Sequence, residues 1–130
     1  MTDRKQVLLL LTLAHNDLRA AKGMNDPEIF TDEIFGFHVQ QAAEKALKAW
    51  LALLGVLYPK IHELAVLFQL LRDHGQDTSP FDQMIEYSGF AVQFRYELHG
   101  SGDAPVDRQE SVIRAEKLLR HVELLAKHDD

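Results

Sequence analysis

The chain has 130 residues, no cysteine, and a formal net charge of −6 with histidine counted as neutral. This length suits one domain spanning residues 1–130, with a core large enough to fold without cross-links. The missing thiols exclude disulfides and thiolate metal sites and predict a cytoplasmic protein. The acidic balance disfavours non-specific attraction to nucleic-acid backbones, and the apolar run Val7–Leu11 is too short to cross a membrane.

Apolar residues recur at helical spacing along nearly the whole chain, without an alternating strand pattern. The pattern predicts five helical segments, over about residues 3–21, 31–54, 62–72, 79–99 and 105–126. Glycine and proline interrupt the pattern between the segments, and the connections are short, which favours antiparallel neighbours. The sequence therefore predicts an all-α fold, an up-and-down antiparallel helical bundle of about five helices.

The second segment is the longest and carries a predicted packing seam at steps of three and four residues: Phe35, Val39, Ala42, Ala46, Ala49 and Leu53. Gly55 is a suitable stop for this helix. In the fourth segment, Ser79 is expected to cap the helix and Pro80 to take its first position. Both helices thus have boundaries that local chemistry predicts.

A polar row lies beside the seam of the second segment, at steps of three, four and three: His38, Gln41, Lys45 and Lys48. Glu44 and Lys48 are four residues apart, which predicts an ion pair along the helix. One interpretation of the row is a solvated helix face. Because Phe37 and Trp50 flank it in the sequence, the other interpretation is a surface that contacts a ligand or a partner subunit.

The stretch FRYELHG, residues 94–100, ends the fourth segment and places Arg95 and His99 one helical turn apart. Arg95 continues the apolar stripe of its helix, so it should face a partner or a polar cleft and not a dry core. A basic helix end closed by Gly100 is the competing explanation, since cations in a last turn interact favourably with the helix dipole.

The common enzyme signatures are missing from the sequence. It contains no Glu-x-x-His, no His-Glu-x-x-His, no Gly-x-Ser-x-Gly and no phosphate-binding glycine loop. No metal site and no cofactor are therefore predicted.

Two stretches together resemble the HEPN domain family of prokaryotes: FGFHVQQAAEKALKAWLALLGVLYPKIHEL, residues 35–64, and FRYELHG. The family's Gln-Gln-Ala-x-Glu-Lys-Ala-x-Lys run matches Gln40–Lys48, its proline turn with His-x-Leu matches Pro59 and 62–64, and its Arg-Tyr pair matches Arg95 and Tyr96. The resemblance implies a helical bundle that forms a homodimer. It also implies a minimal nucleotidyltransferase as partner, in pairs that include toxin–antitoxin systems.

Some family members are metal-independent endoribonucleases, whose motif is an arginine and a histidine separated by four to six residues. In this chain three residues separate Arg95 from His99, and Ser101 stands where the extended motif has a tyrosine. Two functions therefore stay open, beside a helical scaffold that binds no ligand. One is RNA cleavage by Arg95 and His99 of two subunits; the other is a non-catalytic module that binds a nucleotide or a protein through the polar row and Tyr96.

Overall fold

The computed structural model describes residues 3–91 and 105–128, and these confirm the all-α prediction: they contain helices and no strand. The helices are α1 (Arg4–Gly23), α2 (Asp32–Leu53), α3 (Leu64–Asp73), the 3₁₀ helix η1 (Ser79–Ser88) and α5 (Arg108–Lys127).

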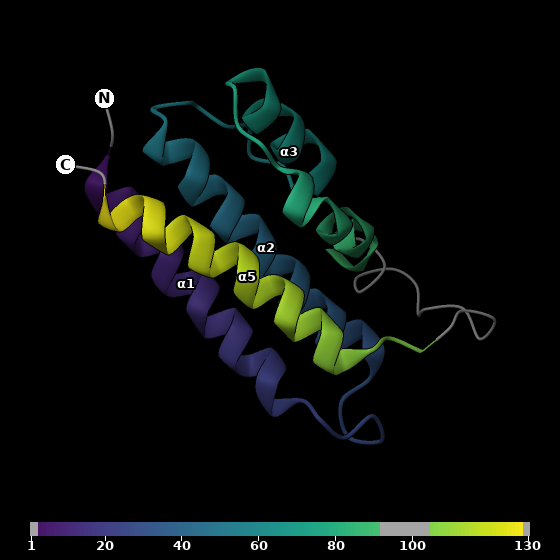
Figure 1. The fold of residues 1–130 in the computed structure, drawn as a ribbon. Coiled ribbons are helices and arrows are strands. Elements are labelled where there is room, and N and C mark those ends of the chain that lie inside the picture. Colours follow the sequence, from purple (N-terminus) through teal and green to yellow (C-terminus); the bar gives the residue numbers. More distant parts are fainter. Residues whose placement is uncertain (1–2, 92–104, 129–130) are drawn as a thin grey trace.

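Helix α2 is the centre of the bundle, because it contacts α1, α3, η1 and α5 (Figure 1). The predicted seam explains this position: Phe35, Val39, Ala42, Ala46 and Ala49 are all buried, and Leu53 is partly buried against the same core. The core also includes leucines from the neighbouring helices, among them Leu18, Leu67 and Leu118. Small alanines alternating with larger residues let α2 pack closely against several helices at once.

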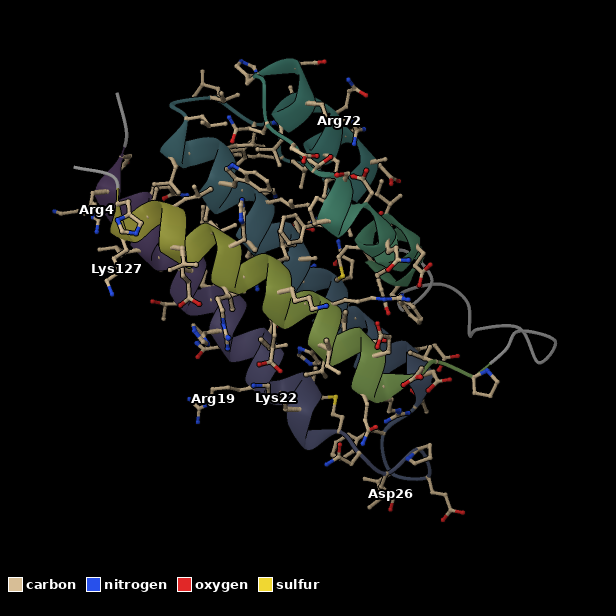
Figure 2. The ribbon with its side chains drawn as sticks, viewed as in Figure 1. Arg4, Arg19, Lys22, Asp26, Arg72 and Lys127 are labelled. Carbon is tan, nitrogen blue, oxygen red and sulfur yellow. The ribbon has the colours of Figure 1, made fainter. Side chains whose placement is uncertain are left out.

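Helices α1 and α5 run in opposite directions along α2. Arg4 at the start of α1 donates a hydrogen bond to the carbonyl oxygen of Ala126 near the end of α5, at 2.8 Å. Figure 2 shows Arg4 beside Lys127 at this end of the bundle, where both termini lie. At the opposite end, Arg108 of α5 contacts Asp32 of α2 at 2.9 Å, so these two helices begin together.

Side-chain caps set four of the helix starts, including that of α3, where the Glu63 carboxylate accepts from the backbone N–H of Ala65. The carboxylates of Asp3 and Asp107 and the hydroxyl of Thr31 each accept a hydrogen bond from a backbone N–H in the first turn of α1, α5 and α2, respectively. Gly55 follows α2 with a φ of 71°, a left-handed conformation that glycine adopts without strain. The predicted stop of α2 is thus confirmed.

The predicted cap of the fourth segment is wrong. Ser79 is the first residue of η1, and its backbone N–H and hydroxyl both donate to Asp77 Oδ1. This stretch is also a 3₁₀ helix over its first ten residues, with α-helical geometry from Gly89 to Ala91. Sequence spacing does not separate the two forms over so few residues, because both bring residues i and i+3 to similar sides.

Candidate functional site

The predicted catalytic residues Arg95 and His99, and the adjacent Tyr96, lie outside the described residues. The described structure does show the anchors on both sides of them. On one side, Phe90 packs so tightly on Gly36 of α2 that a Cβ at Gly36 would come within 2.4 Å of its ring. On the other, the backbone N–H of Val106 donates to Asp32 Oδ2 at 3.2 Å. Both anchors lie in the first turns of α2.

Arg108 reinforces the second anchor. Its guanidinium donates to the carbonyl oxygens of Met24 and Phe30, at 2.7 and 2.6 Å, and to the carboxylate of Asp32. It also lies 5.0 Å from the centre of the Phe35 ring, a cation–π arrangement. One side chain thereby joins the α1–α2 connection, the start of α2 and the start of α5.

The first half of the polar row is built around a carboxylate from another helix. His38 Nδ1 lies 3.0 Å from Asp17 Oδ1, and the Lys45 ammonium donates to Asp17 Oδ2. Asp17 belongs to α1, and its side chain is only 13% exposed. The Phe37 ring meets His38 edge-on, with ring centres 5.5 Å apart. These contacts pin α1 to α2 and leave His38 and Lys45 about one-quarter exposed.

The second half of the row is built around Glu44, whose side chain is 5% exposed. Its carboxylate accepts hydrogen bonds from Lys48 at 3.1 Å, from His62 Nδ1 at 2.9 Å and from the Gln40 amide at 3.0 Å. Gln40 in turn accepts from the Gln41 amide at 2.7 Å. The predicted pair of Glu44 and Lys48 is confirmed, as part of a network that ties α2 to the connection leading into α3.

Two opposing effects act on Glu44. Burial raises the pKa of its carboxyl, whereas hydrogen bonds from Gln40, His62 and Lys48 and the charge of Lys48 lower it. The lowering effects win, and the pKa lies below the ordinary value of 4.5. Glu44 is therefore a carboxylate at neutral pH, and it neutralises Lys48.

Trp50 does not flank the row. It is buried on the opposite side of α2, where its Nε1 donates to Gln76 Oε1 at 3.2 Å and its ring meets that of His121. The reason is geometric, because two residues after Lys48 the helix has turned by about 200°. Burial beside Trp50 and Phe81 lowers the pKa of His121 below 6.5.

A polar hollow of about 390 Å³ lies between η1 and the start of α5. At its wall the buried hydroxyls of Tyr87 and Ser111 are hydrogen-bonded, and Arg114 lies between the carboxylates of Glu86 and Glu110, at 2.9 and 3.3 Å. Asp107 also lines it. Three carboxylates outnumber one guanidinium here, so the described part of this hollow is unsuited to binding a phosphate.

In the part of the chain that the structure describes, no group of three or more histidine and carboxylate side chains could hold a metal ion. Within the same residues, no helix combines the length and apolarity needed to cross a membrane.

A comparison of the sequence with models of protein families gives a match over nearly the whole chain. The model of the HEPN domain matches residues 7–127. The chain belongs to the HEPN domain family. Neither curated proteins nor solved structures gave a significant match.

The match of the HEPN model includes the polar row, both carboxylates and the stretch FRYELHG. The structure brings the four predicted residues of the row onto one side of α2 and adds Asp17, Gln40 and His62, which sequence reasoning did not assign to it. Asp17 carries a weak signal, since it lies on the edge of the apolar stripe of α1. Gln40 gives no signal in the periodicity, because an amide with no exposed surface is not expected there, although it is the first residue of the family run matched in the sequence.

Proposed function

We propose that this HEPN domain, comprising residues 1–130, is the dimeric helical subunit of a pair with a minimal nucleotidyltransferase, in a toxin–antitoxin-like system. Family membership supports the proposal at the level of the HEPN domain. The observation that favours a protein partner over loose RNA binding is that both lysines of the polar row already form ion pairs within the chain. Lys45 and Lys48 are already bound to Asp17 and Glu44, so these cations are not free to attract phosphates.

Paired charges suit a protein interface for a physical reason. Covering an ion pair that the chain has already made and partly buried removes less hydration than covering two free ions. Polar side chains in such a row can still supply hydrogen bonds to a partner, which fix orientation more than affinity.

The test is affinity purification of the tagged chain from its native cell extract, followed by mass spectrometry and measurement of the mass of the complex. A nucleotidyltransferase recovered in stoichiometric amount is the expected result. Recovery of the chain without any such subunit would overturn the pairing. A variant with Gln41→Ala separates the two roles of the row, because Gln41 is uncharged and only partly buried. Loss of the partner with unchanged melting would identify Gln41 as a contact residue.

Metal-independent RNA cleavage is the second proposed function, motivated by Arg95 and His99 in FRYELHG. In this mechanism His99 acts as general acid or base on the ribose 2′-hydroxyl or the leaving oxygen. Arg95 binds the phosphate and stabilises the charge that develops on it. Two subunits would supply two of each residue, so the acid and the base can be different copies.

Cleavage of a mixed RNA pool in the presence of a chelator tests this mechanism. The wild type is compared with Arg95→Ala and His99→Ala, each checked for unchanged mass and melting. A rate that falls by about 100-fold or more in both variants supports catalysis, since a positioned general base contributes at least that much. Equal background cleavage in all three proteins would remove Arg95 and His99 from the chemistry.

A further inference from the structure

A second hollow lies at the end of the bundle where α1 ends and where α2 and α5 begin (Figure 1). We refer to it as the junction hollow. Its volume is about 310 Å³, at the lower end of the range for small-molecule sites. Apolar side chains from all three helices line it: Ala21 of α1, Phe35 of α2, and Val112 and Ile113 of α5. A hollow of this size and lining suits the apolar body of a small molecule and is too small to hold a helix.

The charged residues that line the junction hollow, Lys22 and Arg108, are both cationic. Among the described residues no carboxylate lines it, although the chain as a whole carries a net charge of −6. The hollow between η1 and α5 has the opposite character, since Glu86, Asp107 and Glu110 line it together with one guanidinium. The junction hollow is therefore suited to an anion, in a chain whose net charge is negative.

Arg108 has donors left over for such an anion. A guanidinium has five N–H groups. Three of them donate within the chain, to the carbonyl oxygens of Met24 and Phe30 and to the carboxylate of Asp32, which leaves two. No described residue accepts from these two, and only 12% of the side chain is exposed. A polar group at this depth is stabilised by an added acceptor, and charged acceptors such as carboxylates form the stronger bonds to a guanidinium.

Lys22 supplies the charge that balances a bound anion. Arg108 already has an acidic partner within the core of the junction, whereas Lys22 pairs with Glu116 at the surface, at 3.3 Å. The side chains of that surface pair are 47% and 34% exposed, so water screens their attraction and hydrates Glu116 when the ammonium turns to a ligand. At the rim, the amides of Asn25 and Gln109 form no hydrogen bond with a described residue and can bind a polar head group.

We propose that the junction hollow binds a small organic carboxylate with an apolar body. The carboxylate accepts from the two remaining donors of Arg108 and pairs with Lys22, and the body packs on Val112 and Ile113. The mainly apolar lining favours a carboxylate over a phosphate ester, because a phosphate carries more charge into a site with one exchangeable cation. The proposal is independent of the pairing with a nucleotidyltransferase, which rests on the polar row, because none of the residues of that row lines the hollow.

Two-dimensional proton–nitrogen NMR of the 14.8 kDa chain tests the proposal, because one titration gives both the affinity and the location of a ligand. The probe is naphthoate, whose roughly 13 non-hydrogen atoms predict a dissociation constant of about 1 mM or below. Shifted amide signals are expected in residues 21–25 and 108–113. Naphthamide has the same body without the charge and should bind at least about tenfold more weakly, because hydrogen bonds to a charged acceptor are about twice as strong.

Two pairs of variants locate the site. Ile113→Glu places a carboxylate in the hollow at a side chain that is 45% exposed, and should weaken naphthoate binding at least about tenfold by like-charge repulsion. Its control is Leu124→Glu, also on α5 and 51% exposed, which should bind as the wild type does. Lys22→Met should weaken binding about threefold, whereas Lys127→Met, at the other end of the bundle (Figure 2), should leave it unchanged. Far-ultraviolet circular dichroism during melting confirms that each protein is folded.

Three results would each overturn a different part of the proposal. No shifted signals with naphthoate at about 10 mM, roughly ten times the expected constant, would overturn the site itself. Naphthamide or naphthyl phosphate binding as tightly as naphthoate would overturn the class of ligand. Equal dissociation constants for the variant and the control of either pair would overturn the placement in the junction hollow. None of these results depends on a nucleotidyltransferase partner, which purification from the native extract tests separately.

Discussion

Each half of the polar row contains one carboxylate. The two carboxylates differ in how deeply they are buried and in whether their bonds stay within one helix. Glu44 is almost completely buried and lies on the same helix as its partner Lys48. Asp17 is less buried and comes from α1, so its bonds to His38 and Lys45 join two helices. From this difference we expect Glu44 to stabilise the fold more than Asp17, because it is more deeply buried. Only the pair within one helix could be predicted from the sequence.

Removal of Glu44 should be the most damaging change in the row. In Glu44→Ala the ammonium of Lys48 and the amide of Gln40 lose a common acceptor in a nearly dry site, and we expect a loss of about 3 kcal/mol in the free energy of unfolding. Urea denaturation measures it. Glu116→Ala is the control, because Glu116 pairs with Lys22 at the surface, where such a pair is worth under about 1 kcal/mol. Equal losses in both variants would refute the importance of burial.

Removal of Asp17 should cost less. In Asp17→Ala, His38 and Lys45 lose their acceptor, but each is about one-quarter exposed and can be hydrated instead. We expect a loss of about 1–2 kcal/mol in the same urea experiment. A loss larger than that of Glu44→Ala would reverse the comparison and would place the main polar anchor between α1 and α2.

Acid titration separates the Glu44 network from the rest of the protein. The folded-state pKa of Glu44 lies below 4.5, so its carboxylate stabilises the fold fully above that pH. This stabilisation is lost as the pH falls from 4.5 through the folded-state pKa. Glu44→Gln should therefore be less stable than the wild type at neutral pH and should lose stability less steeply below pH 4.5. Urea denaturation at a series of pH values measures this. Free energies of unfolding that fall in parallel for the two proteins below pH 4.5 would contradict the role of the Glu44 carboxylate.

His121 offers the smallest expected effect and a contrast with His38 and His62, which both contact carboxylates. Burial beside Trp50 lowers the folded-state pKa of His121 below 6.5, so its neutral form is favoured. Below pH 6.5 the unfolded chain therefore binds more protons at His121 than the folded chain does. The free energy of unfolding decreases as the pH falls through this range. Between pH 8 and pH 6 the melting temperature should fall less for His121→Phe than for the wild type. An equal fall in both proteins would show that His121 does not contribute to this pH dependence.

The sequence predicted the elements better than their contacts. The seam of α2 and the stop at Gly55 follow from local chemistry, and the structure confirms them. The ion pair of Glu44 and Lys48 was predictable for the same reason, because four residues make one helical turn. The geometry of η1 was not, because α and 3₁₀ winding share much of their short-range spacing. The roles of Arg95, Tyr96 and His99 stay predictions.

The sequence by itself determined a helical chain, the order and approximate extent of its helices, and a resemblance that the HEPN model confirms. These properties are encoded by periodicity, capping residues and motif spacing, which act over a few residues. Only the tertiary structure decided that Asp17 binds His38 and Lys45, and that His62 completes the shell of Glu44. Those partners are separated by 18 to 28 residues, and their distances depend on how whole helices pack, which the local pattern does not specify.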